Sequence, residues 1–520
     1  MAGKYLIGID EGTMSSRACI FDLEGNLLGS SAGEYGVTSP RPGWYEQDVE
    51  AMAKVIYAAC QGAIREAGID PNEIIAVGLS SQGAAFVPVD ENDEVVRPCI
   101  GWQDVRGVPY FEELKPEVTP DEYYAISGIP FGTSPWSVSK ILWIRDNEPD
   151  NYDRTACFAL HQDYFLNALG VEGHYADIAS ASRYGIFDID NHQYSDKLLD
   201  ASDLSKETLA EVVKGGTQVG TVNAHVSELT SIPEGTPICV GAMDVNASIL
   251  GLGVIEPGMA GTILGTYGTC IALSGEPVRD PNGAMVVMGN VGTRKWTMEG
   301  SSLAAASSYR WFRDTFGGLE VAMGTVLKED PFELINRQIA TSRAGARGLV
   351  FIPHLASAGA PRNNANARGV LLGLTLAHTK ADIARAVMEG ISMEIRDIIA
   401  AEERAGIDIK EVRITGGGTK SPMWNQIQAD VYGVPARTVQ TSETGSLGAA
   451  MLAGVGAGVF DDVEEAVGEM VHVTSVYEPN PDNTAIYDEV YEVYDTAFKG
   501  LSESDTYEKV SALQAKLGLE

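Results

Sequence analysis

The stretch Tyr5-Leu-Ile-Gly-Ile-Asp10-Glu-Gly-Thr-Met-Ser-Ser-Arg17 decides how the rest of the chain is interpreted. Residues 5–9 are apolar and predict a buried strand that ends at the Asp10 carboxylate. Gly12 permits a tight turn, and the hydroxyl groups and Arg17 that follow add hydrogen-bond donors and a positive charge. This combination suits a phosphate group and its metal ion. Glu-Gly-Thr is also ordinary hairpin-turn chemistry, so both interpretations stand on this stretch alone.

The size and charge of the chain limit what it can be. With 520 residues it is too long for one compact core, so we expect at least two domains. A hydrophobic content of 44% and a charged content of 21% are typical of soluble globular proteins. The net charge of −35 repels nucleic acid and anionic membranes, so we expect neither as a partner. Any phosphate site must then be local, built from backbone donors, helix ends and Mg²⁺.

The cysteines and the apolar runs predict a cytoplasmic protein. The six cysteines lie far apart with no Cys-x-x-Cys pair, which argues against a zinc site and against a disulfide framework. Most of them lie in apolar runs, so we expect buried free thiols in a reducing compartment. The apolar run before Asp10 is too short for a signal peptide, and no uninterrupted apolar run is long enough to span a membrane.

Predicted strands and helices alternate along the chain. Strands are predicted over residues 5–9, 18–22, 27–34, 74–80, 237–243, 260–264, 349–355, 371–375 and 412–415. Helices are predicted over residues 49–67, 246–252, 301–316, 378–404, 422–432 and 445–458, and also in the tail after Pro479. Residues 107–170 are predicted to be mainly helical and irregular, and residues 175–182 to form a loop. A strand followed by Gly-Thr after residue 260 echoes the opening stretch, which suggests an internal duplication with a boundary near residue 250.

Three glycine-rich turns follow predicted strands: Gly12-Thr13, Gly265-Thr266 and Gly416-Gly417-Gly418. Each alone is a weak signal, but together they fit a nucleotide held between two domains. Two other nucleotide-binding patterns fail. No Gly-x-x-x-x-Gly-Lys-Ser/Thr occurs, and after Gly251-Leu-Gly253 the third glycine of a dinucleotide-binding motif is replaced by Glu256.

Asp244 is the second carboxylate of interest. It ends an apolar strand and is followed by small residues, so we expect it in a cleft. A carboxylate there can take the proton of a substrate hydroxyl as that hydroxyl attacks the γ-phosphate of ATP. The alternative is a helix N-cap for the segment that starts at Val245.

Four motifs in order make the chain resemble the FGGY family of carbohydrate kinases. The first is the opening stretch from Asp10 to Arg17, and the second is Asp244 followed by Leu264-Gly265-Thr266. The third is Phe351-Ile-Pro-His-Leu with Asn366-Ala-Arg-Gly-Val-Leu-Leu-Gly-Leu-Thr375. The fourth, Thr415-Gly-Gly-Gly-Thr-Lys-Ser-Pro-Met-Trp-Asn-Gln426, resembles an adenosine motif.

The resemblance implies an α/β fold of two actin-like (ribonuclease H-like) ATPase domains that close over ATP, Mg²⁺ and a small sugar. Residues 1–250 would bind sugar, metal and phosphate, residues 251–480 would bind ATP, and residues 481–520 would form a helical tail. Asp10 would order Mg²⁺, and Asp244 would be the general base. The expected ATP-binding residues are Thr13, Ser15, Arg17, Gly265, Thr266, Arg310, Gly417, Gly418 and Pro422. Met14 departs from the glycerol kinases, which carry a hydroxyl there, so one phosphate contact is either missing or made by backbone.

The expected sugar-binding residues are Gln82, Gly83, Trp102, Asp104, Asp244 and Asn246. Glycerol kinases carry an Arg-Glu pair where this chain has Gly83-Ala84, and D-xylulose kinases carry Met-His, so the region around Gln82 looks closer to the L-xylulose kinase type. Small residues at 83 and 84 predict a roomier pocket with no spare cation, which suits an uncharged pentulose better than a sugar acid. Asp104 either accepts sugar hydroxyls or forms an ion pair with Arg106. His161 and His354 are expected to be structural.

Two other functions stay open at this point. The first is a kinase of another small polyol or ketose, such as erythritol, a tetrulose, glycerol or the dihydroxypentanedione signal. The second is a non-catalytic actin-like protein that binds nucleotide and sugar and reports to a partner. Family habit also suggests a homodimer, although no residue pattern indicates one.

Overall fold

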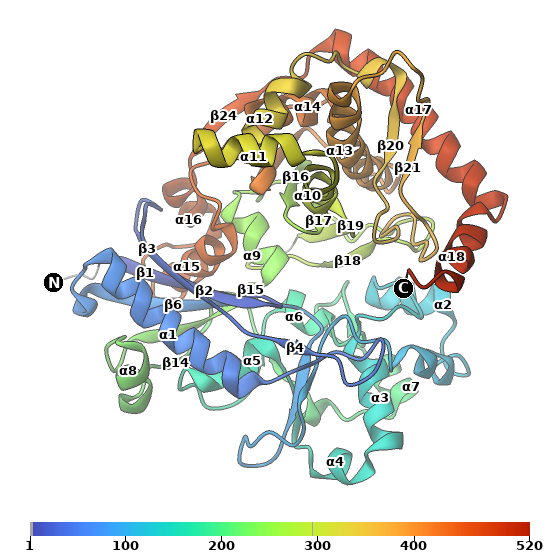
Figure 1. Ribbon diagram of the computed structural model, residues 1–520. Coiled ribbons are helices and arrows are strands. Elements are labelled where there is room, and N and C mark those ends of the chain that lie inside the picture. Colours follow the sequence, from blue (N-terminus) through green and yellow to red (C-terminus); the bar gives the residue numbers. More distant parts are fainter. Residues whose placement is uncertain (1–3, 294, 520) are drawn as a thin grey trace.

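The first large sheet lies in the half of the molecule coloured from blue to green (Figure 1). The computed structural model describes residues 4–293 and 295–519. Strands β1 (Tyr5–Glu11), β2 (Ser15–Asp22) and β3 (Leu27–Glu34) form an antiparallel meander, which confirms the three strands predicted at the start of the chain. The sheet continues with β6 (Ile74–Ser81) and β15 (Pro237–Met243), both parallel to β1, and β14 (Gln218–Thr221) closes its edge.

The second large sheet repeats this strand order in the other half. Its antiparallel part is β16 (Met259–Leu264), β17 (Gly268–Ser274) and β19 (Trp296–Ser302), with β18 (Val286–Gly289) at the edge. It continues with β22 (Glu411–Gly416) and β23 (Ala436–Val439), both parallel to β16, and ends with antiparallel β24 (Val473–Tyr477). This shared topology confirms the expected pair of actin-like α/β domains.

Two helices cross between the halves (Figure 1). They are α9 (Asp244–Gly251), which follows the first sheet, and α15 (Thr444–Gly456), which follows β23 of the second. A Cβ at Gly8 of β1 would lie 1.8 Å from the carbonyl oxygen of Ser446, so α15 packs directly on the first sheet. Helix α9 instead packs on β17 of the second sheet through Ile249. Each half therefore covers the other half's sheet with one of its own helices.

The remaining elements surround these two sheets. The other helices are α1 (Val49–Ala67), α2 (Pro120–Ser127), α3 (Ser137–Asn147), α4 (Pro149–Arg154), α5 (His161–Ala168), α6 (Ile178–Ser182), α7 (Asp196–Ser202), α8 (Ala224–Thr230), α10 (Ala305–Phe316), α11 (Gly318–Leu327), α12 (Pro331–Ile339), α13 (Lys380–Arg404), α14 (Pro422–Tyr432), α16 (Val463–Met470), α17 (Pro481–Glu503) and α18 (Thr506–Lys516). The short strands are β4 (Val37–Thr38), β5 (Glu46–Gln47), β7 (Phe86–Val89), β8 (Cys99–Ile100), β9 (Cys157–Leu160), β10 (Tyr175–Ala176), β11 (Phe187–Asp188), β12 (Gln193–Tyr194), β13 (Glu211–Val212), β20 (Val350–Ile352) and β21 (Val370–Leu372).

Two sequence predictions are wrong in detail. Residues 175–182 form β10 and α6 instead of a loop, because Asp177 caps the short helix by accepting hydrogen bonds from the backbone N–H groups of Ala179 and Ser180. Residues 301 and 302, predicted to be helical, are the end of β19, and helix α10 begins only at Ala305.

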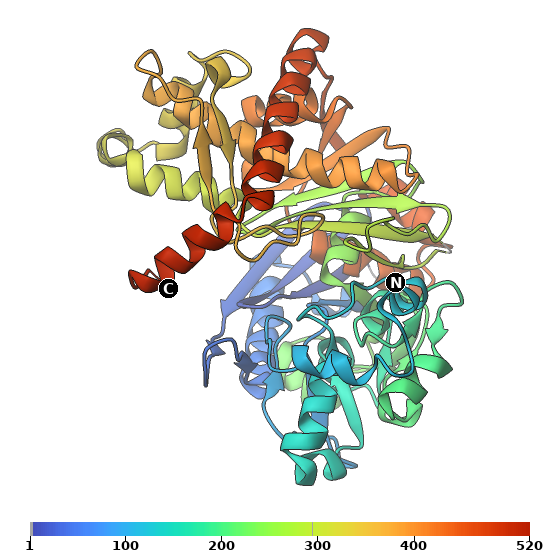
Figure 2. The ribbon, with the colours of Figure 1, turned by 90° about the vertical axis from the view of Figure 1, so that its right-hand side faces the viewer.

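The tail packs along the outside of the second half (Figure 2). Tyr487 and Tyr494 of α17 are completely buried. The Tyr487 hydroxyl donates to Glu389 at 2.7 Å and accepts from Arg385 at 3.0 Å, and both partners lie on α13. These two tyrosines, which lie seven residues apart on one face of α17, therefore pack the tail against α13.

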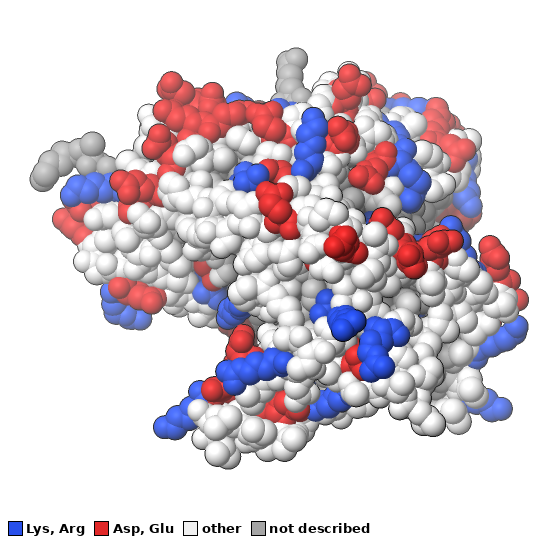
Figure 3. Space-filling view, turned by 90° about the horizontal axis from the view of Figure 1, so that it is seen from above, with Lys and Arg blue, Asp and Glu red and all other residues white. Residues whose placement is uncertain are grey.

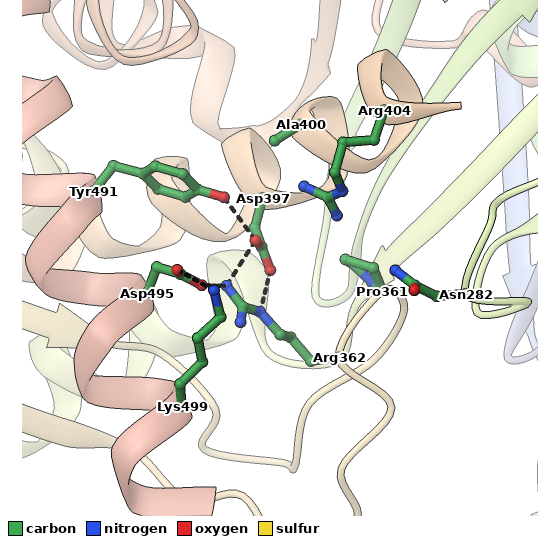
Figure 4. Close-up of a pocket in the computed structure, with 9 residues that line it drawn as sticks. All are labelled: Asn282, Pro361, Arg362, Asp397, Ala400, Arg404, Tyr491, Asp495 and Lys499. Carbon is green, nitrogen blue, oxygen red and sulfur yellow. Dashed lines mark hydrogen bonds and ion pairs between the residues drawn. The ribbon is translucent and has the colours of Figure 1, made fainter. Parts of the chain in front are cut away.

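A cavity of about 400 Å³ lies where α13, α17 and the loop around Arg362 meet (Figure 4). Arg362 forms ion pairs with Asp397 at 2.5 Å and with Asp495 at 2.7 Å, and the Tyr491 hydroxyl donates to Asp397 at 2.8 Å. These contacts join the tail to α13. The cavity shares no residue with the predicted site, so we interpret its charges as part of the packing.

The surface and the thiols agree with the composition. Seen from above, acidic side chains gather along one edge, with basic side chains interspersed elsewhere (Figure 3). All six cysteines are buried free thiols, as predicted. No helix among residues 4–293 and 295–519 is long and apolar enough to cross a membrane.

Candidate active site

Two carboxylates meet at the edge where β1, β6 and β15 end. These strands are parallel, with Asp10 opposite Ser80 and Met243 opposite Ser81. The Ser80 hydroxyl donates to Asp10 Oδ1 at 3.0 Å. Because Asp244 directly follows Met243, the sheet brings it to the same edge as Asp10. Residues far apart in the sequence thus share one side of a single site.

Negative charge is disfavoured at both carboxylates. The pKa of Asp10 is raised to about 6. Burial is the main cause, the nearby carboxylates of Glu11 and Glu443 add to it, and the hydrogen bond from Ser80 acts in the opposite direction. Burial and then the nearby Asp10 raise the pKa of Asp244 to about 7. A divalent cation would favour the ionised form of both groups. This edge therefore fits Mg²⁺, the ion expected at Asp10.

Asp244 is the first residue of α9 and lies inside the helix, with Met243 as the N-cap. Its Oδ1 accepts a hydrogen bond from the backbone N–H of Val245 at 2.7 Å. That bond leaves Oδ2 for another partner. The N-cap role considered from the sequence is therefore wrong, since Met243 is the N-cap, and the hydrogen bond to Val245 leaves a catalytic role open to Asp244.

The first glycine-rich turn joins β1 to β2. The Gly12 N–H donates to the Ser15 carbonyl oxygen at 3.0 Å, which closes the turn. The Thr13 hydroxyl accepts a hydrogen bond from Trp102 Nε1 at 3.0 Å. Arg17 forms an ion pair with Glu443 at 3.0 Å, just before α15. Met14 is 57% exposed, so its side chain points to solvent and any phosphate contact at this position comes from backbone.

The other two turns lie side by side in the second half. Strands β16 and β22 are parallel, with Leu264 opposite Gly416, so Gly265 and Gly417 follow neighbouring strand ends. Of the remaining residues expected to bind ATP, Thr266 is exposed at this edge, Arg310 is exposed on α10, Gly418 packs against the ring of Trp424, and Pro422 begins α14.

The first and second turns face each other across the two halves. The ring of Trp102, which bonds Thr13, lies 6.5 Å from the ring of Tyr267 in an edge-to-face contact. Tyr267 directly follows Thr266. The structure therefore brings the phosphate residues predicted from both halves around one space.

Several buried polar atoms beside Asp244 make no hydrogen bond to the described part of the chain. They are both amide atoms of Asn246, Oε1 of Gln82 and the hydroxyl of Ser81. Buried polar groups in folded proteins normally have a partner. These atoms therefore fit a ligand that carries several hydroxyl groups.

The space expected at Gly83 is already filled. A Cβ there would lie 2.6 Å from Met243 Sδ and 3.1 Å from Arg183 Cγ. The prediction of a roomier pocket at this position is therefore wrong. A cation does lie nearby, but it is not a spare one. Arg183 is mostly neutralised, because its Nη2 pairs with Glu299 at 2.7 Å.

Asp104 takes the second of the two roles that the sequence allowed. It is completely buried, and Arg106 donates to both of its carboxylate oxygens at 2.7–3.0 Å. The backbone N–H of Tyr45 adds a further hydrogen bond at 2.7 Å. With its oxygens engaged in this way, Asp104 supports the Trp102 segment, which differs from the direct sugar contact expected for it.

Two groups of residues were missed from the sequence. Glu11 is completely buried and accepts hydrogen bonds from Gln82 at 2.7 Å and from Tyr35 at 3.1 Å, with the His161 ring at 3.2 Å. The apolar run before Asp10 was the available signal, because its burial continues through Glu11. The Arg183–Glu299 pair had no local signal, since its members come from different halves.

Comparisons with known proteins agree with this geometry. The family model "FGGY family of carbohydrate kinases, N-terminal domain" matches residues 5–251, and the corresponding C-terminal domain matches residues 260–457. A xylulose kinase of Lactococcus lactis is 28% identical over 96% of this chain and 97% of its own length. A glycerol kinase of Paraburkholderia phymatum is 32% identical over 89% and 92%. The crystal structure of a gluconate kinase from Lactobacillus acidophilus, 25% identical, superposes with a TM-score of 0.88 over 98% of this chain and 100% of its own.

The two matched domains span most of the chain, and the relatives match over nearly their full length. Together with the two actin-like sheets, these matches show that the chain belongs to the FGGY family of carbohydrate kinases and is a phosphotransferase.

Proposed function

We propose that this protein transfers the γ-phosphoryl group of ATP to a hydroxyl of a pentulose such as xylulose, with Asp244 as the general base. The observation that carries the proposal is the position of Asp244, at the sheet edge that also carries Asp10 and two residues before Asn246, whose amide is unpartnered among the described residues. The relatives named xylulose kinase support the choice of sugar.

The proposed chemistry assigns separate tasks to the two carboxylates. Asp244 accepts the proton of the sugar hydroxyl while the oxygen of that hydroxyl forms a bond to the γ-phosphorus of ATP. At the same time the bond between the γ-phosphorus and the ADP oxygen breaks. Asp10 would hold Mg²⁺, which supplies positive charge next to the phosphates when it is bound. Because burial raises the pKa of Asp244 to about 7, this carboxylate is a stronger proton acceptor than an ordinary aspartate.

The phosphate groups of ATP would lie between the turns of the two halves. We assign them to Thr13, Ser15 and Arg17 on one side and to Gly265 and Thr266 on the other, where backbone N–H groups and hydroxyls are available. Arg310, Gly417, Gly418 and Pro422 would line the nucleotide. This division corresponds to a sugar-binding domain over residues 1–250 and an ATP-binding domain over residues 251–480, followed by the tail at 481–520.

The sugar would be held mainly by neutral groups. Gln82 is fixed through its Nε2, which donates to Glu11 at 2.7 Å, so its Oε1 is left to accept a sugar hydroxyl. Asn246 can both donate and accept through its unpartnered amide. Trp102 provides an apolar wall, and Asp104 keeps this wall in place through Arg106. An uncharged polyhydroxy substrate satisfies these groups without a further charge.

A sugar acid is the second candidate, because Arg183 places a guanidinium beside Gly83. A gluconate kinase is among the similar structures. We rank this candidate lower since Glu299 already neutralises Arg183. Compared with a pentulose, glycerol and tetruloses offer fewer hydroxyl groups to the unpartnered atoms, and erythritol lacks the keto oxygen.

A substrate panel tests the proposal. ADP release is measured with ATP and Mg²⁺ over pentuloses, tetruloses, polyols and sugar acids. We expect the highest kcat/KM with a pentulose. The highest value with gluconate or another sugar acid would replace the pentulose by the second candidate. ATP binding without sugar-dependent ADP release would instead indicate a non-catalytic sensor.

A further inference from the structure

A second cluster of chemically reactive side chains lies outside the kinase site. Cys157 begins β9, Asp163 lies in the first turn of α5, and His174 directly precedes β10. One ligand atom from each of the three residues lies within 4.8 Å of the other two. His174 Nδ1 lies 3.2 Å from Asp163 Oδ2.

The Asp163 carboxylate has an incomplete set of partners. It is completely buried, and neither oxygen accepts a well-aligned hydrogen bond from the part of the chain that the structure describes. Its one close charged contact is the His174 ring. Buried carboxylate oxygens normally have hydrogen-bond partners, so the oxygens of Asp163 can accept a cation as a further partner.

The second ring nitrogen of His174 also contacts a carboxylate. His174 Nε2 lies 3.0 Å from Asp93 Oδ1, in the turn after β7. Metal-binding histidines commonly donate their second ring N–H to a carboxylate, which fixes the tautomer and turns the first nitrogen towards the metal. Asp93 plays this part, with Nδ1 directed towards Asp163 and Cys157.

We propose that Cys157, Asp163 and His174 bind a Zn²⁺ ion, with Asp93 orienting the histidine. Sulfur, nitrogen and oxygen ligands together suit Zn²⁺, whereas Mg²⁺ selects oxygen ligands alone. In a tetrahedral Zn²⁺ site the ligand atoms lie about 3.3–3.8 Å apart, so the cluster has to contract by only about 1 Å. This site was not expected from the sequence, because the cysteine has no second cysteine near it and its partners follow at irregular spacing.

A cavity lies beside the histidine of this cluster. It has a volume of about 530 Å³ and is lined by His174 and Asp93, together with Tyr164 and Glu172. A water molecule would be the fourth ligand of a tetrahedral site. The bound ion would join β9, α5 and the segment before β10 at one point.

Metal titration of the full-length protein tests this site. The protein is stripped with a chelator and titrated with Co²⁺ alone, which reports a bound thiolate by a charge-transfer absorption band, and then with Zn²⁺ alone by calorimetry. We expect the Co²⁺ band to appear, Zn²⁺ to bind with about one ion per chain, and excess Mg²⁺ to leave both unchanged. Absence of the band, or displacement of the metal by Mg²⁺, would overturn the proposal.

Variants assign the ligands. Cys157→Ser should abolish the Co²⁺ band, and His174→Asn should weaken Zn²⁺ binding about tenfold or more. Cys60→Ser is the matched control, because Cys60 is equally buried in α1 but has no such neighbours. An unchanged band in Cys157→Ser, or an equal loss in Cys60→Ser, would contradict the assignment. His174 is partly exposed, so its replacement tests the site even if Cys157→Ser fails to fold.

Discussion

Replacing Asp244 by asparagine separates the chemical role of this carboxylate from its cost to the fold. Asparagine keeps the size of the side chain and can still accept the hydrogen bond from the backbone N–H of Val245. It cannot accept the sugar proton. We therefore expect kcat to fall by about 10²–10⁴-fold, the usual contribution of a general base. This corresponds to about 3–5 kcal/mol of activation free energy.

The same substitution should stabilise the protein without substrate at pH 8. The pKa of Asp244 is raised from 3.8 to about 7 in the folded state, so the folded state binds its proton more tightly than the unfolded chain does. Stability from this group is therefore fully present below about pH 4 and is lost progressively as the pH rises from about 4 to about 7. The full shift corresponds to at most about 4 kcal/mol. Because the side chain is only partly buried, we expect the variant to gain about 1–2 kcal/mol at pH 8 and roughly a third of that at pH 5.

Two assays and one matched variant test the role of Asp244 as the base and the effect of its charge on stability. Steady-state ADP release gives kcat, and denaturant unfolding in a chelator at pH 5 and pH 8 gives the free energy of unfolding. Asp10→Asn is the matched variant, since Asp10 shares the edge but would act on Mg²⁺, so it should raise the KM for Mg-ATP while Asp244→Asn leaves that constant nearly unchanged. Turnover of Asp244→Asn within about threefold of wild type, far short of the usual contribution of a general base, would refute its role as the base. A variant less stable than wild type at pH 8 would refute the electrostatic argument.

Three further predictions concern the same site. In wild-type protein kcat/KM should rise with pH up to about 7 and then level off, because only the ionised form of Asp244 accepts a proton; a pH-independent value from pH 5.5 to 8 would contradict this. Asn246→Ala should raise the KM for the sugar about tenfold with little change in the KM for ATP, since its unpartnered amide is assigned to the sugar; an effect on ATP alone would reverse that assignment. Trp102→Phe removes the hydrogen bond to the Thr13 hydroxyl and should raise the KM for ATP about fivefold, which initial-rate measurements can check against the Asn246 variant.

Helices with clear capping residues at both ends were predicted with the same first and last residues as in the structure. Helix α1 ends at Gly68, which adopts φ 63°, and begins after Asp48, whose side chain accepts from the backbone N–H of Ala51. Helix α14 has the same kind of signals at Ser421 and Gly433. Helix α6 was missed because it is short and lacks a periodic apolar face, so that its cap, Asp177, was the main signal.

The candidate site likewise contains residues that the local sequence indicates and residues that only tertiary contacts bring together. Asp10 and Asp244 could be found from the sequence because each ends an apolar strand, and strand ends at one sheet edge meet in space. What fills the space at Gly83 could not be found, since Arg183 and Met243 reach it from other elements and Glu299 comes from the second half. Tertiary contacts of this kind leave no periodic trace in the sequence, and for that reason the surroundings of Gly83 could not be predicted.

Asp10 and Asp244 lie at the N-terminal ends of α15 and α9, the two helices that cross between the halves. A Cβ at Gly445, in the first turn of α15, would lie 2.8 Å from Asp10 Oδ2, and one at Gly251 of α9 would lie 2.0 Å from the Thr444 carbonyl oxygen. Glycine is required at both positions because any side chain would separate the helices from each other or from Asp10. The helix N-termini carry partial positive charge, so both favour anions at the edge shared by Asp10 and Asp244. Since α15 belongs to the second half and packs on the first sheet, a movement between the halves that shifts this helix changes the distance between its N-terminus and Asp10, the residue proposed to hold Mg²⁺.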